Sequence, residues 1–312
     1  MPSTSLLDLP LELRNLIITH VLYAHRPAPA KPTTTNRTNY RDIAYRSWAC
    51  RAYSEQHDTH SPSNCLALLL TCRQLSIETQ ALLDLPSASS EYHLDIAYVN
   101  EFNLYPTWIC VPRLTTHVPK LHVSVRLLGH MVSPEEARLQ GGDGGETRFP
   151  WTFYALLERF LAYGPVGEKK GKEIPRYDWK GPFYMDRNVT IGTLILNITS
   201  AETELPFPPA DRDFMWWFLA QRVSSRYKNP ENVQYKPRPE WIVQHLGTHI
   251  GALLWMTERV RGELAQIMYE RIGAIRILIE GESYREWELP ETLAEIRRTR
   301  EVDSLPDWMR GE

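Results

Sequence analysis

The 312-residue sequence predicts an α+β fold, in which an N-terminal helical module packs on a mixed α/β domain with a sheet of at least four strands. Two observations carry this prediction. Apolar residues recur every three or four positions over residues 6–22 and again over 65–83, the period of an amphipathic helix. From residue 92 onward, several short segments instead alternate with a period of two, as half-buried strands do.

The first predicted helix opens at Pro10. A residue that precedes proline is steered out of the α region, so we expect Leu9 to lie outside the helix and Pro10 to occupy its first position. Glu12 then lies at the positive end of the helix dipole, where a carboxylate is favourable. Apolar residues share one face of this helix at positions Leu9, Leu13, Leu16, Ile17 and Val21.

A second helix is predicted from Cys65 to Leu83, with Asn64 as its cap and Pro86 beyond its end. This helix carries two apolar stripes. One comprises Leu66, Leu70, Ile77 and Ala81, and the other comprises Leu68, Cys72, Leu75 and Leu82. Two stripes predict burial on more than one side.

These two segments carry a resemblance to a known family. The pattern Leu9-Pro10-x-Glu12-Leu13-x-x-x-Ile17-x-x-x-Val21-Leu22, followed by Leu68-Leu69-Leu70-Thr71-Cys72-Arg73-Gln74-Leu75, resembles an F-box. The chain is similar to poorly characterised F-box-like proteins of filamentous ascomycete fungi, and the similarity extends through 92–99, 106–109 and 141–145 to about residue 200. Two departures are that about forty residues separate the helical pieces and that no tryptophan follows Arg73.

The resemblance implies a function as well as a fold. An F-box attaches a substrate receptor to a Skp-type adaptor of a cullin (SCF) ubiquitin ligase. The adaptor-binding residues that it implies here are Leu9, Pro10, Leu13, Leu16, Ile17 and Val21. The leading hypothesis is therefore a non-enzymatic interaction protein that binds this adaptor and a protein substrate of unknown identity. The alternative is an F-box-derived fold that has lost adaptor binding and acts as a general interaction or structural protein.

Residues 26–63 differ in composition from both helices. They open with Pro27, Pro29 and Pro32, followed by a polar threonine- and asparagine-rich run, a composition that cannot bury enough apolar area to offset its ordering entropy. We expect a flexible insertion with a short helical turn near residues 43–48. Six basic residues against three acidic ones leave it with a net charge of +3, so a docking patch is the alternative to a solvated loop.

The remaining elements follow from the same periodicities. Strands are predicted at 92–98, 121–127, 189–198 and 275–279, and helices at 151–163, 211–226 and 239–271. The predicted organisation is a helical module over residues 1–85, an interaction domain over 86–281, and a polar tail over 282–312 with one short helix around 291–300.

The composition limits which classes of partner and which cellular compartment we expect for this protein. A formal charge of −3 provides no broad positive field for nucleic acid, so nucleic-acid binding is not expected. The sequence shows neither a secretory signal nor an uncharged apolar run of membrane length. Four cysteines are too few and too scattered for a disulfide framework. We expect an intracellular protein, cytoplasmic or nuclear, without a membrane partner.

Motifs for catalysis or metal binding are weak. Cys50, His57, His60, Cys65 and Cys72 lie close in sequence but match no zinc spacing. The glycine loop 141–145 lacks the spacing of a dinucleotide or phosphate loop, and no Gly-x-Ser-x-Gly or His-Glu-x-x-His is present. We expect no enzyme, no catalytic or metal residue and no cofactor. The third hypothesis is an enzyme or ligand-binding protein with a site near the glycine loop 141–145. Trp216 and Trp217 are read as core residues, or one of them as a partner anchor.

Overall fold

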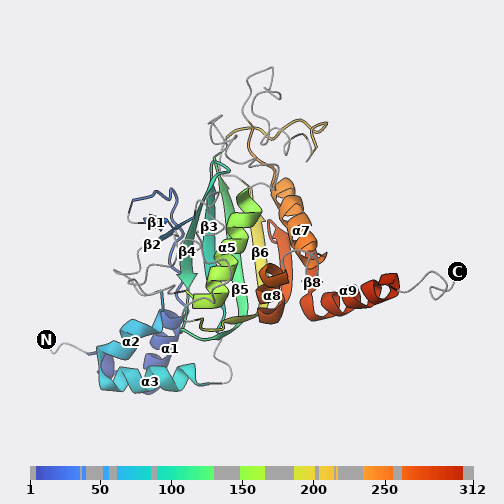
Figure 1. Cartoon of the computed structure of the whole chain (residues 1–312). Helices are drawn as coiled ribbons and strands as arrows, with labels where there is room; N and C mark the ends of the chain where they lie inside the picture. Colours follow the sequence, from blue (N-terminus) through green and yellow to red (C-terminus); the bar gives the residue numbers. More distant parts are fainter. Residues whose placement is uncertain are drawn as a thin grey trace.

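The computed structural model describes residues 5–35, 37–39, 52–55, 62–85, 90–129, 148–165, 186–200, 204–213, 216, 235–255 and 262–304. In these ranges the chain forms seven α-helices, a 3₁₀ turn, a two-stranded sheet and a six-stranded sheet (Figure 1). The elements are η1 (Leu6–Asp8), α1 (Leu11–Leu22), β1 (Arg37–Asn39), β2 (Tyr53–Glu55), α2 (Cys65–Thr71), α3 (Arg73–Leu83), β3 (Tyr92–Val99), β4 (Asn103–Cys110), β5 (His117–Leu128), α5 (Arg148–Tyr163), β6 (Thr190–Thr199), α7 (Pro239–Trp255), α8 (Gly262–Arg271), β7 (Ile272–Ile279), β8 (Glu282–Glu288) and α9 (Leu289–Ser304).

The six-stranded sheet has the order β4-β3-β5-β6-β7-β8. Its four central strands, β3, β5, β6 and β7, pair in parallel, and β4 and β8 join antiparallel at the two edges. The four central strands are the ones that the sequence predicts, so the expected mixed α/β architecture with at least four strands is confirmed. Helix α5 at Arg148–Tyr163 likewise confirms the helix predicted at 151–163.

The two faces of the sheet differ in chemistry. Apolar side chains of one face pack against α5 and α7 in a single large core, which includes Tyr92, Ile96, Val123, Phe153, Leu161, Leu246 and Ile250. Residues between those positions on β3 and β5 point to the opposite face. They are largely polar and include His93, Asp95, His122 and Arg126. The strand period therefore separates a helix-covered core from a polar surface.

In the six-stranded sheet, the sequence predicts neither β4 nor β8, and it predicts only a short helix around 291–300 where α9 spans Leu289–Ser304. The segment expected as a polar tail from residue 282 begins with edge strand β8 and continues into α9, whose Leu289 and Ile296 are buried. Strand β8 has no apolar alternation because its first five residues are exposed to solvent at the sheet edge. Strand β4 also lacks an alternating pattern, but for the opposite reason. It is buried on both faces, and it contains Pro106.

The long helix predicted at 239–271 also differs from the structure. Its ends form two helices, α7 and α8, and residues 256–261 between them lie outside the described ranges. Of the helix predicted at 211–226, the structure describes 211–213 and Trp216.

Part of the insertion at 26–63 is ordered against the sheet, unlike the loop that its composition predicts. Strands β1 and β2 pair antiparallel, and Ala52 bridges to Leu104 on β4. The ring of Tyr53 stacks on Tyr105 with centroids 5.3 Å apart. The predicted helical turn at 43–48 lies outside the described residues.

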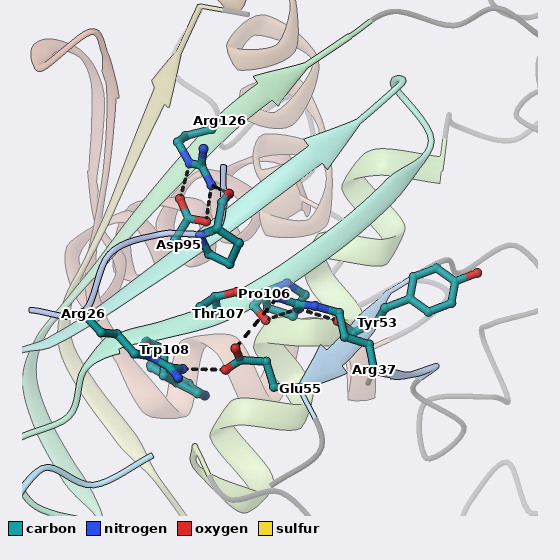
Figure 2. A network of polar contacts seen from close by, with 10 residues as sticks. Arg26, Arg37, Tyr53, Glu55, Asp95, Pro106, Thr107, Trp108 and Arg126 are labelled. Carbon is teal, nitrogen blue, oxygen red and sulfur yellow. Dashed lines mark hydrogen bonds and ion pairs between the residues drawn. The ribbon is translucent and has the colours of Figure 1, made fainter. Parts of the chain in front are cut away.

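Arginine side chains hold this insertion to β4 (Figure 2). Arg37 donates to the carbonyls of Tyr53 (3.0 Å) and Pro106 (2.9 Å) and to the hydroxyl of Thr107 (2.7 Å). Arg26 donates to the carbonyl of Trp108 and pairs with Glu55. Arg26 and Arg37 belong to the basic residues that the sequence analysis considered as a docking patch. In the structure, both donate to carbonyls of the chain's own backbone.

A second arginine contact fastens the segment after α1 to the polar face of the sheet. Arg126 on β5 donates two hydrogen bonds to the carboxylate of Asp95 on β3, at 2.6 and 2.9 Å. The same guanidinium donates to the carbonyl of Pro29 at 2.8 Å. Because Asp95 is almost fully buried, this bidentate pair is shielded from solvent and binds three chain segments together.

We predict that Asp95→Ala lowers the free energy of unfolding by about 3–5 kcal/mol, because it leaves the Arg126 guanidinium without its counter-charge in a largely buried position. Urea denaturation followed by circular dichroism measures the change. The matched control is Glu286→Ala, which breaks the exposed pair with Arg276 on the same sheet and is expected to change stability by about 0–1 kcal/mol. Equal losses in the two variants would contradict the proposed importance of the Asp95 pair.

Candidate functional site

Helix α1 turns one face toward the other N-terminal helices. Ile18 and Leu22 are fully buried and pack with Cys65, Leu75 and Leu83 in a small core that is separate from the core of the sheet. Neither Ile18 nor Leu22 belongs to the apolar stripe that the sequence analysis singled out.

The predicted stripe lies on the opposite side of α1 and faces solvent. Leu13, Leu16, Ile17 and Val21 are between 38 and 59% exposed. Pro10 is also exposed, and Leu9 is half-buried. The four helical members of the predicted adaptor-binding set are thus exposed on α1, and together with Leu9 and Pro10 we call them the α1 stripe. Helix α1 is apolar on two sides and uses one of them for internal packing.

The start of α1 differs by one residue from the prediction. Pro10 has an extended ψ of 148° and is the N-cap, so the helix begins at Leu11. Before it, Ser5 and Asp8 form a capping box around the turn η1. Leu9 lies outside the helix, as expected from the proline that follows it.

A partly buried ion pair sets the rotation of α1. Arg14 donates from Nε and Nη2 to the Glu78 carboxylate of α3, with distances of 2.6–3.2 Å, and from Nη1 to the carbonyls of Leu7 and Leu9. The hydrogen bonds from Arg14 hold the pKa of Glu78 below its ordinary value. This contact ties the entrance of α1 to α3 and keeps the α1 stripe outward.

The second predicted helix is broken at Cys72, whose extended backbone (φ −156°, ψ 164°) separates α2 from α3. Its two stripes have different surroundings. Leu68, Cys72, Leu75 and Leu82 pack inward, whereas Leu66, Leu70, Ile77 and Ala81 are exposed. The prediction that both stripes are buried is therefore wrong for the chain by itself.

Exposed hydrophobic side chains are concentrated in this module. Eleven of the fourteen large ones among the described residues lie between Leu6 and Leu85, and Leu70 and Ile77 reach 75 and 61% exposure. Single exposed leucines are ordinary on a protein surface, but such concentration on one small module is typical of a surface that binds another protein.

The module lies at one end of the sheet (Figure 1). Main-chain and side-chain contacts join the two. The backbone amides of Asn64 and Cys65 donate to the carbonyls of Val111 and Pro112, which follow β4. The side chain of Asn64 does not cap α2 as predicted; it donates to the carbonyls of Leu22 and Ala24 at 2.9 and 3.0 Å. Asn64 therefore links the end of α1 to the start of α2.

A second group of side chains has metal-binding chemistry. Glu91, His93 and His122 place one potential ligand atom each within 4.8 Å of the others, at the polar face of the sheet. Burial, with help from the neighbouring His122 and His25, lowers the pKa of His93 to about 4. Sequence spacing could not reveal this group, because His122 lies on a different strand from His93.

Other candidates from the sequence lie partly outside the described residues. The glycine loop 141–145, Cys50, His57, His60 and Trp217 all do. Cys65 is buried in the module core. Trp216 packs against Tyr235 and Trp241, with ring centroids 6.4 Å from each. This half-buried position agrees with the core interpretation.

Comparison with protein-family models, with curated proteins and with solved structures finds no match to this chain. Among the residues that the structure describes, no helix has both the length and the apolar composition needed to cross a bilayer.

We predict that Glu78→Gln lowers stability near neutral pH by weakening the contact with Arg14. Because folding depresses the pKa of Glu78, its carboxylate stabilises the fold above its ordinary pKa, and this contribution is lost as the pH falls through the depressed value. The difference in stability between parent and variant should therefore become smaller as the pH is lowered from about 7 to about 3.

Urea midpoints measured across this range check the prediction. Glu286→Gln, in an exposed pair, serves as the control and should leave the midpoint near neutral pH almost unchanged. A difference between parent and Glu78→Gln that stays constant with pH would contradict the assigned role of the carboxylate.

Proposed function

We propose that this protein is a non-enzymatic interaction protein whose N-terminal module binds a Skp-type adaptor, making it a substrate receptor of a cullin-type ubiquitin ligase. The observation that supports the proposal most strongly is the exposed α1 stripe. The sequence resemblance assigns adaptor binding to Leu9, Pro10, Leu13, Leu16, Ile17 and Val21, and four of these are large aliphatic side chains left in solvent by the folded chain.

The energetics of such a surface favour docking. Burying an exposed aliphatic side chain stabilises a complex by roughly 1.5–3 kcal/mol, and an apolar helix face that enters a hydrophobic groove is a recurrent mode of recognition. The stripe is also preorganised, because Arg14, Glu78 and the small core beneath α1 hold the helix in one orientation. Little ordering entropy is then lost on binding.

The arrangement of the module is compatible with a receptor. Helices α1, α2 and α3 lie at one end of the sheet, away from α7 and α9 (Figure 1). In this proposal the sheet domain carries the surface for the protein substrate, while the module carries the adaptor. The long connection between α1 and α2 does not prevent their packing, since both contribute to one core.

The alternative is a module that has kept the fold and lost the adaptor contact. The same exposed stripe then binds a different protein. Direct measurement with the adaptor separates the two functions.

The predicted result is that the full chain binds a purified Skp-type adaptor in isothermal titration calorimetry. Leu16→Ala combined with Ile17→Ala should weaken binding about a hundredfold, at roughly 1.5 kcal/mol for each truncated side chain. Stability should stay within about 0.5 kcal/mol of the parent, because both side chains face solvent.

Leu114→Ala is the matched control, since Leu114 is equally exposed but lies outside the module, in the connection before β5. Its affinity for the adaptor should equal that of the parent. If the well-folded parent fails to bind at tens of micromolar, the adaptor function is rejected and the alternative interaction function stands. An equal loss in the Leu114 variant would reject the α1 stripe as the binding surface.

A further inference from the structure

Parallel pairing of β3 and β5 brings two histidines together on the polar face of the sheet. His93 is the register partner of His122, and their rings stack with centroids 4.6 Å apart and planes 7° from parallel. Glu91 immediately precedes β3 on the same side. Three side chains from two neighbouring strands therefore converge, and all three are half-buried.

The convergence is close to what a metal ion requires. Glu91 Oε2 and His122 Nε2 are 3.0 Å apart. Two ligand atoms that each lie 2.0–2.1 Å from a tetrahedral zinc ion are about 3.3 Å apart, so this pair already has nearly the right separation. One ring nitrogen of His93 lies within 4.8 Å of a ligand atom of each of the other two residues. Its ring is nearly parallel to that of His122, so shared binding of one ion requires the His93 imidazole to turn about χ1 and χ2.

The carboxylate is also oriented by a further contact. Lys120 donates from Nζ to Glu91 Oε1 at 3.1 Å, while the other oxygen, Oε2, faces His122. Hydrogen bonds of this kind commonly fix a ligating carboxylate. The positive charge of Lys120 opposes a cation, but its side chain is about half exposed, and solvent screens the repulsion.

We infer that Glu91, His93 and His122 form a three-ligand site for a divalent transition-metal ion, with Zn²⁺ as the ion that best suits the donor set. Two neutral imidazoles and one carboxylate are the protein ligands of a known class of zinc site, in which a fourth position is open to water. Any proton on His122 Nε2 moves to solvent when the ion binds, while Nδ1 carries the remaining ring proton.

This inference does not depend on adaptor binding, because the cluster lies on the sheet and the α1 stripe lies on the helical module. The segment after α1 nevertheless crosses the same face. The His25 ring contacts the His93 ring at a tilt of 50°, with ring centroids 4.4 Å apart, and Arg126 donates to the carbonyl of Pro29. An ion at this cluster would thus sit beside the connection between the module and the sheet.

The test uses the full chain after removal of bound metal by a chelator. Zn²⁺ is added in isothermal titration calorimetry near neutral pH, and Co²⁺ is added in a parallel absorbance titration. We expect one ion to bind tightly per chain, with a cobalt spectrum that lacks a thiolate-to-cobalt charge-transfer band. His93→Ala and His122→Ala should each weaken Zn²⁺ binding by at least about tenfold.

His117→Ala is the matched control, because His117 lies on β5 as well but bonds to Thr190 outside the cluster. It should bind Zn²⁺ as the parent does. Zn²⁺-dependent shifts of the His93 and His122 ring resonances in the parent provide a second measurement that does not depend on the folding of the variants. Absence of Zn²⁺ binding, equal affinity in all four proteins, or a thiolate band that shows cysteine ligation would each overturn the inference.

Discussion

Side chains of a strand alternate between the two faces of a sheet, and this constraint organises most of the molecule. The four parallel central strands place their apolar residues under α5 and α7, and the residues between them must then point to the other face. Polar groups there need partners. Asp95 pairs with Arg126, and His122 contacts Glu91 at hydrogen-bond distance. The same alternation that builds the core therefore creates the polar face that receives the segment after α1.

The helical module meets a different constraint. Three short helices enclose too small a core to bury all of their apolar residues, and α1 is apolar on two sides. Ile18 and Leu22 fill the internal core, so the α1 stripe is left at the surface. The contact between Arg14 and Glu78 determines which side of α1 is buried and which is exposed, because it fixes the rotation of α1 against α3. We propose that this exposed surface binds a partner.

The two regions are joined by specific contacts rather than by a loose linker. Asn64 connects the ends of α1 and α2, and its backbone amide pairs with Val111 at the end of β4. Arg113 donates to the carbonyl of Leu83 at the end of α3. Arg126 and Arg37 hold parts of the intervening insertion against the sheet. In the proposed receptor, adaptor and substrate surfaces would thus be held at a defined separation.

The sequence by itself determined the helix at 11–22, helix α5 and the four central strands, because hydrophobic periodicity is a local property of the chain. It also identified the α1 stripe as apolar, but only packing against α3 decided that this side faces solvent. Strand β4, buried on both faces, and the polar edge strand β8 lack the alternation that would reveal them. The pairing of His93 with His122 depends on the register of two strands distant in sequence, and only the tertiary structure decides it.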